Sequence, residues 1–372
     1  MSAFHADDPG STPGWRIIYK CLLLNLYMRK EIVVSILSIL LIAVGWFFLK
    51  VAFKDISDIA LIIFSIISFV TLFISARDSW YSFILVFLSL ITITSALGVS
   101  FGSVYTGDAP IRLNLVLSPI VMLSASIVVS WFFIIYSRKF KSRNAYPLAL
   151  LILFVLVWIV LAFNTTFFED WKLENYLTVP FVIIIFIAHK WFRLSNISYT
   201  LIFLFMAMHI YGSHYTYSEV PFGFWLQDLL NSSRNHYDRI VHFSFGLLLA
   251  YPLREMILRI ANAKGVWGLY IPVDVVLALS ALYEILEWAT AAIYGGDLGI
   301  AYLGSQGDVF DAQKDMALAG TGSIITMLIT FFVLWVNKKE EFGKEFKESF
   351  KVKKHSPLGE QELSRIVKRK KS

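Results

Sequence analysis

Residues 303–321 read LGSQGDVFDAQKDMALAGT and place four charged side chains at the entrance of a segment that is otherwise apolar enough to span a membrane. On a helix, Asp308, Asp311 and Asp315 are separated by three and four residues, so their side chains would share one face within about two turns. Three carboxylates on one face of a membrane helix are costly unless other groups neutralise them, and intramembrane charge is by default a functional-site hypothesis. Lys314 alone does not balance them, so partners must come from other parts of the chain.

The composition excludes a soluble protein. Hydrophobic residues make up 57% of the 372 residues and charged residues 16%, which is typical of a polytopic membrane protein. The net charge of +6 comes from basic residues beside apolar segments, so a nucleic-acid partner is not expected. One cysteine, Cys21, allows neither an intrachain disulfide nor a cysteine-rich metal site. The polar N-terminus lacks the features of a cleaved secretory signal, so we expect the first apolar helix to be retained.

Ten apolar segments approach or exceed the roughly 20 residues that a helix needs to cross a bilayer. They lie at 32–53, 56–75, 80–104, 115–136, 147–168, 176–192, 198–217, 235–258, 266–292 and 309–336. The predicted fold is therefore an all-α, polytopic transmembrane helical bundle of about ten spans. Lys and Arg concentrate in alternate loops, so the positive-inside rule places both termini in the cytoplasm and the loop around Gly296 outside.

The polarity of the spans changes along the chain. Residues 1–31 combine a polar N-terminus with a basic segment suited to an interfacial helix. Few polar residues lie deep in the spans of 32–143, which we interpret as a four-helix leader, whereas 144–336 forms a six-helix core rich in them. A basic cytoplasmic tail follows at 337–372. Because the leader has few groups that need partners in the core, we expect a chain beginning near Arg143 to insert and fold without it.

In this topology the polar residues of four spans meet near the outer face. At 1.5 Å per residue, His242, Glu284 and Asp315 each lie on the order of 10 Å below the outer ends of their helices. Lipid cannot solvate such groups, so they should face the interior of the bundle. The candidate catalytic residues are His209, His214, Asp238, Arg239, His242, Glu284, Glu287, Asp308, Asp311 and Asp315. The candidate metal ligands are Asp238, His242, Glu284, Glu287, Asp311 and Asp315.

Each candidate also has a structural explanation. The charged residues could form structural ion pairs, made by Arg234 or Arg239 with Asp238 and by Lys314 with Asp311 or Asp315. Asp308 could cap its helix. A lone histidine is more often packed than functional. However, the six carboxylates of this end face three permanent cations. Either some carboxyl groups are protonated or a bound cation balances them. Carboxylate ligands favour Mg, Mn or Ca, and an imidazole ligand would also allow Zn or Fe to bind.

Four ordered motifs resemble one known family. They are HIYGSHYTY at 209–217, NHYDR at 235–239 followed by His242 and Phe243, YEILEW at 283–288, and QGDVFDAQKDM at 306–316. Together they resemble the bacterial inner-membrane family typified by YjdF, a domain of unknown function, over about 145–336. The resemblance implies a multi-pass protein of the bacterial cytoplasmic (inner) membrane and brings no activity with it.

Three functions remain open on the sequence. The favoured one is a membrane-embedded enzyme, with a divalent metal as the candidate cofactor, that acts on a lipid or lipid-linked substrate; its expected partner is membrane lipid. The others are a proton- or cation-coupled transporter and a non-catalytic scaffold. The polar groups gather near one face and no internal repeat is evident, which argues against transport. The chain lacks the HExxH motif of familiar metallohydrolases.

Overall fold

The structure is a computed structural model and describes residues 58–102, 112–138, 142–352 and 358–369. Within these ranges every regular element is a helix, as predicted. The interfacial helix predicted in residues 1–31 and the span predicted at 32–53 lie outside the described residues. The chain divides into two compact units between Thr166 and Phe167.

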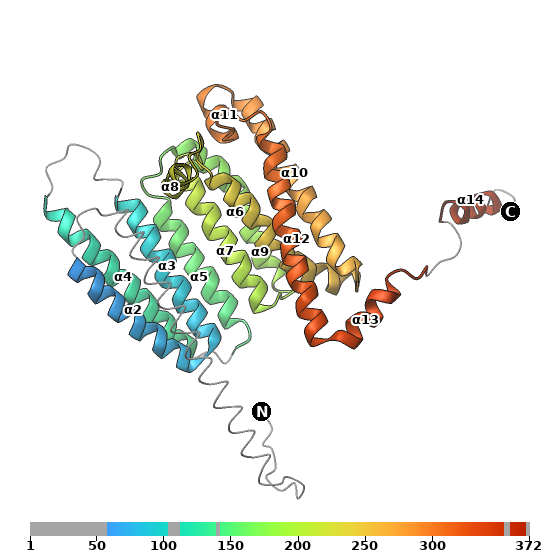
Figure 1. The fold of residues 1–372 in the computed structure, drawn as a ribbon, viewed down its shortest axis with the longest axis horizontal. Coiled ribbons are helices and arrows are strands. Elements are labelled where there is room, and N and C mark those ends of the chain that lie inside the picture. The colour runs from blue at the N-terminus through green and yellow to red at the C-terminus, as the bar shows by residue number, and fades with distance from the viewer. Residues whose placement is uncertain (1–57, 103–111, 139–141, 353–357, 370–372) are drawn as a thin grey trace, which may run out of the picture. The chain divides into compact units, whose positions relative to one another are not determined.

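The first unit holds α2 (Asp58–Asp78), α3 (Trp80–Gly102), α4 (Arg112–Arg138) and α5 (Ala145–Leu161). Figure 1 shows these helices side by side, coloured from blue to green. Hydroxyl groups join α3 to α4 through Ser89 and Ser130, whose Oγ atoms are 2.8 Å apart. The α5 helix packs on α3, where the rings of Tyr81 and Tyr146 are 5.0 Å apart. In packing, α5 therefore groups with the helices that precede it.

The second unit holds the remaining helices. They are α6 (Phe168–Ala188), α7 (Asn196–His214), α8 (Pro221–Leu229), α9 (Tyr237–Ala261), α10 (Trp267–Tyr294), α11 (Gly296–Leu303), α12 (Asp311–Asn337), α13 (Lys339–Glu348) and α14 (Leu358–Arg369). Among the described residues, 80–97 of α3 and the helices α6, α9, α10 and α12 are long and apolar enough to cross a membrane, with shorter apolar stretches at 64–77, 124–137 and 145–161. The polytopic helical fold is confirmed, and the total of ten spans stays a prediction.

The helices α9 and α12 cross closely because small residues line their contact. A Cβ atom added at Gly246 of α9 would lie 1.8 Å from the carbonyl oxygen of Ala319, and one at Gly322 of α12 would lie 2.2 Å from that of Phe243. Further along, the Thr326 hydroxyl donates to the Leu247 carbonyl at 2.5 Å. Both helices begin at the same end of the unit, so this crossing fixes their first turns against each other.

The connection into α12 departs from the prediction at one residue. Gly304 and Gly307 have φ angles of 61° and 85°, the left-handed conformation that glycine adopts without strain. Asp308, predicted in the first turn of the helix, lies instead in the turn before it, and α12 begins at Asp311. The reason is local: the Asp308 carboxylate accepts the Phe310 N–H at 3.1 Å, and such a bond competes with helical hydrogen bonding.

The segment after α12 folds back onto the unit. Its first helix, α13, packs Phe342 against Phe331 with ring centroids 5.6 Å apart. At its end, the Ser349 hydroxyl accepts the Val266 N–H at 3.0 Å, and the Ser349 carbonyl accepts the indole N–H of Trp267 at 3.0 Å. The basic tail predicted from residue 337 onward therefore begins with a helix that holds the α9–α10 connection.

Candidate functional site

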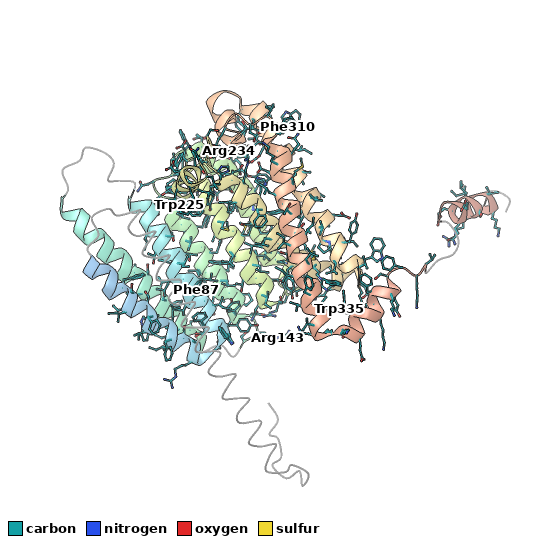
Figure 2. All side chains as sticks on the ribbon, in the orientation of Figure 1. Phe87, Arg143, Trp225, Arg234, Phe310 and Trp335 are labelled. Atoms are coloured by element: carbon teal, nitrogen blue, oxygen red, sulfur yellow. The ribbon has the colours of Figure 1, made fainter. Side chains whose placement is uncertain are left out.

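Five helices of the second unit bring their polar residues to one end. These residues lie in the first turns of α6, α9 and α12 and in the last turns of α7 and α10. Figure 2 shows Arg234 and Phe310 at this end, with Trp335 at the other end of α12. The convergence predicted from the alternating directions of the helices is thus present in the structure.

The outermost part of the site is a network of ion pairs. Both Nη atoms of Arg234 donate to the carboxylate of Asp311, the second at 3.4 Å. Arg239 Nη2 and Lys314 Nζ each lie 2.5 Å from Asp308 Oδ2. The Lys314 contact and the Phe310 N–H together lower the pKa of Asp308 to about 2. The predicted partners of Lys314 were Asp311 or Asp315, whereas its carboxylate partner in this network is Asp308.

This network uses the permanent cations of the site. Arg234 is 6% exposed and makes its closest contacts with Asp311, lying 3.8 Å from both Asp238 and Asp308. Arg239 contacts Asp308 and, at 3.5 Å, Asp311. The structural explanation therefore accounts for Asp308, Asp311 and Arg239, since both carboxylate oxygens of Asp311 contact arginines.

Beneath the network lies a compact group formed by Asp238, His242 and Asp315. One ligand atom from each lies within 4.8 Å of the others, and His242 Nε2 is 3.5 Å from Asp238 Oδ1. Ligand atoms that share one divalent ion are at most roughly 4 to 5 Å apart, given bonds of about 2.0–2.6 Å. These three residues, here called the Asp–His–Asp group, could therefore hold a metal ion.

Glu284 joins this group from α10. Its Oε1 atom lies 3.6 Å from His242 Nε2, and no hydrogen bond reaches that buried oxygen. Asp315 is 2% exposed, and its Oδ1 atom is likewise buried without a hydrogen-bond partner. Buried polar atoms are almost always hydrogen-bonded, so two such carboxylate oxygens beside one histidine need an explanation.

A second set of carboxylates lies next to this group and was not predicted. Asp170 and Glu174 on α6 are 1% and 2% exposed, and the hydroxyl of Tyr283 donates to Glu174 at 3.3 Å. With Glu287 and Asp238 they line a small chamber, to which Thr216, Tyr217 and Tyr302 also contribute. The signal was available: Asp170 and Glu174 are an i, i+4 pair at the start of a span, as Asp238 and His242 are. Glu287, predicted as a metal ligand, lines this chamber.

Hydrogen bonding and packing account for the two histidines of α7. His209 Nε2 lies 2.8 Å from the Thr178 hydroxyl, and its Nδ1 lies 2.5 Å from the Tyr217 hydroxyl, so both ring nitrogens have partners. His214 is fully buried, with its ring against that of Tyr215, and lines neither the chamber nor the groove described below. Both were candidate catalytic residues, and the structure places neither next to Asp315.

The first turn of α9 is held by side chains that sequence reasoning missed. Asn235 donates to the Val220 carbonyl at 2.8 Å and accepts the Tyr237 N–H at 3.0 Å. Gln306 bonds both the N–H and the carbonyl of Asn235, at 2.8 and 3.1 Å. Gly223 gives the Asn235 side chain room, since a Cβ atom there would lie 1.6 Å from it. These contacts fix the helix that carries Asp238 and His242.

An apolar groove runs from the Asp–His–Asp group along the bundle. Its volume is about 390 Å³, and its walls come from α6, α7, α9 and α10. At the site end it is lined by Asp238, His242 and Tyr283; its other lining residues include Pro180, Ile184, Phe205, Phe245, Leu249, Leu279, Ser280, Leu282 and Leu286. The groove therefore joins a charged site to an apolar surface of a membrane protein.

Comparison with known proteins gives a family and no activity. A family model described as "Predicted membrane protein (DUF2238)" matches residues 146–335. Inner membrane protein YjdF of Escherichia coli (strain K12) is 36% identical over 159 residues, which cover 42% of this chain and 76% of that protein. No solved structure matches. The region matched by the family model contains all four sequence motifs and every residue of the site.

Proposed function

Because the chain belongs to the DUF2238 family of predicted membrane proteins, which is a multi-pass inner-membrane family without a stated activity, we propose a function from the site itself. The protein is a membrane-embedded enzyme that holds a divalent metal ion at Asp238, His242 and Asp315. It acts on the polar part of a lipid or lipid-linked substrate.

The balance of charge carries this proposal. Arg234, Arg239 and Lys314 make their closest contacts with Asp308 and Asp311, outside the Asp–His–Asp group. Asp315 and Glu284 then both lie beside His242, and each keeps a buried oxygen without a hydrogen bond. Uncompensated charge in such a place costs several kcal/mol. A divalent ion bound between these atoms would remove that cost.

A metal ion here would supply known chemistry. Bound to two carboxylates and an imidazole, it would polarise a carbonyl or phosphoryl oxygen or activate a water molecule. Glu284, adjacent to His242, offers a carboxylate that could move a proton at the same place. The Asp238 and His242 side chains also line the groove, so a bound substrate would reach them from the membrane.

The opposite end of the unit supports an enzyme over a transporter. Glu255 is the carboxylate of α9 nearest that end, and its oxygens accept the Ser195 N–H at 2.9 Å, the Ser198 hydroxyl at 2.6 Å and Arg259 Nη1 at 3.0 Å. Its hydrogen-bonding capacity is used within the protein. Transporters place their ion and substrate sites near the middle of the bilayer, whereas the candidate carboxylates of this unit gather at one end.

Elemental analysis of the purified chain tests the proposal. We expect about one divalent ion per chain, and we expect Asp315→Asn to lose it, because the amide removes a charge and a ligand oxygen with little change of shape. Asp274→Asn is the matched control, since this exposed aspartate lies on α10 away from the site. Metal-free protein whose melting temperature rises with Asp315→Asn would contradict the proposal and show that protons balance the carboxylates.

A further inference from the structure

We propose that the groove beside His242 binds one hydrocarbon chain of a membrane lipid, which enters sideways from the bilayer between α6 and α10. This inference rests on the proposed function, because it names the substrate of that site as a lipid taken up by its chain. It adds the route and the part of the lipid that the protein grips.

The dimensions of the groove suit a single chain. A volume of about 390 Å³ lies within the roughly 300–1,000 Å³ of ligand-sized sites. Along α9 the lining runs from Asp238 to Leu249, which is about 16 Å at 1.5 Å per residue. That length is close to half of the roughly 30 Å hydrocarbon core of a bilayer. The groove therefore extends from the polar end of the unit to about the middle of the membrane, the depth of one leaflet.

The side of the groove faces lipid. On its α6 edge Ile184 is 62% exposed, and on its α10 edge Leu282 is 51% exposed, although both line the groove. The two helices meet at the polar end, where the Tyr283 hydroxyl donates to Glu174, and they make no extensive packing contact elsewhere. A chain can therefore pass between them from the bilayer without leaving an apolar environment.

The polar end of the groove fixes which part of the lipid arrives there. His242 packs edge-on against Tyr283 with ring centroids 5.7 Å apart, and both line the groove with Asp238. A chain lying along Phe245 and Leu249 would place the attached headgroup beside the Asp–His–Asp group. The burial of Asp315 limits access from water, so the membrane side is the open approach for a substrate.

Photolabelling locates the chain. The full-length protein is placed in vesicles of phosphatidylethanolamine and phosphatidylglycerol, in which part of the phosphatidylglycerol carries a diazirine at the end of one acyl chain. After irradiation, labelled residues are identified by mass spectrometry. We expect label on Phe205, Phe245 and Leu249 in excess of that on Ile324 and Leu328, which lie at similar depth on an exposed face of α12.

A blocked groove gives the matched comparison. Ser280 is 2% exposed, lines the groove and has a hydroxyl without a hydrogen-bond partner. We expect Ser280→Trp to fill the space and abolish labelling of Leu249, whereas Ile324→Trp on the lipid-facing surface leaves it unchanged. Equal labelling of Leu249 and Ile324 in the unmodified protein would overturn the inference, whatever the variants do.

Metal analysis of the same samples separates the two proposals. Groove labelling in metal-free protein would refute the metalloenzyme and leave the lipid site standing. Stoichiometric metal without preferential groove labelling would refute the lipid site and leave the metalloenzyme standing. Ser280→Trp should keep its metal, since Ser280 lies outside the Asp–His–Asp group.

Discussion

Neighbouring carboxylates of this site differ in what touches them. Asp311 and Asp315 are one helical turn apart on α12, yet Asp311 is held by two arginines while Asp315 keeps a buried oxygen without a hydrogen bond. Asp308 lies within reach of Arg239 and Lys314, which holds its pKa well below the usual range. The outer aspartates thus bind the ends of α9 and α12 together, and the inner one is left for a ligand.

The pair of Arg234 and Asp311 gives a prediction about stability. Both side chains are buried, so Arg234→Met should leave Asp311 poorly compensated and lower the free energy of unfolding by about 3–5 kcal/mol. The double variant Arg234→Met/Asp311→Leu should recover most of this loss, because apolar pairs often replace buried ion pairs without cost. Thermal unfolding in detergent measures both. A single variant as stable as the unmodified protein would show that Arg239 alone suffices for Asp311.

At the scale of helices, the site depends on the crossing of α9 and α12. His242 is one turn before Gly246, and Asp315 is two turns before Gly322, so the close approach at the glycines sets the distance between the two ligands. The neighbouring Thr326 bond to the Leu247 carbonyl keeps the two helices in register. Small residues are the usual means by which membrane helices approach so closely.

Gly246→Ala tests this crossing. Its new methyl group would meet the Ala319 carbonyl, so we expect destabilisation of about 1–3 kcal/mol or more from overpacking, together with loss of bound metal. Gly343→Ala on α13 is the control, since no atom lies within 4 Å of the added Cβ and alanine favours a helix there. Unfolding measurements and metal analysis are made on both. Metal retained in Gly246→Ala would mean that the Asp–His–Asp group does not depend on this contact.

The sequence allowed the helices to be predicted better than their contacts. Apolar length identified α9, α10 and α12 to within a few residues, because a span must be about 20 residues whatever surrounds it. The short helices α8 and α11 lie in loops and carry no such signal. The predicted span at 176–192 leaves Asp170 and Glu174 in the loop before it, whereas α6 begins at Phe168 and both are buried. Their burial depends on tertiary packing, which apolar length does not reveal.

The candidate site shows the same limit at single residues. The charge excess near Asp315 and the pairing of Asp238 with His242 could be predicted, because they follow from spacing on a helix and from counting charges. The carboxylate that each arginine contacts could not be predicted, because Asp308 and Asp311 lie only three residues apart and both are plausible partners. His209 is a candidate from its place near the outer end of its span, but its two hydroxyl partners come from α6 and from the turn after α7.

For the whole molecule, the matched family region and the compact units do not coincide. The family model begins at residue 146, within α5, and ends at residue 335, within α12. In packing, α5 groups with the first unit, whereas every residue of the site lies in the second. The separate four-helix leader therefore stays a proposal, and a chain beginning near Arg143 would carry α5 without α3, its principal packing partner.

The orientation of the second unit in the membrane decides which leaflet supplies the lipid. The end opposite the site carries Lys190 and Arg193 between α6 and α7, Lys264 between α9 and α10, and Lys338 and Lys339 after α12. Within the described residues, the site end carries fewer basic residues, namely Lys172, Arg234, Arg239 and Lys314. By the positive-inside rule we propose that the site end is extracytoplasmic, so that the groove opens to the outer leaflet of the inner membrane and both termini are cytoplasmic.

Cysteine labelling in intact cells tests this orientation. In a Cys21→Ser background, Ser233→Cys adds an exposed thiol to the connection between α8 and α9, at the site end, and Ala261→Cys adds one at the far end of α9. We expect a membrane-impermeant maleimide to label Ser233→Cys in intact cells. It should label Ala261→Cys only after the cells are lysed, because the bilayer separates the two ends. The opposite pattern would show that the groove opens to the cytoplasmic leaflet and that its lipid comes from that side.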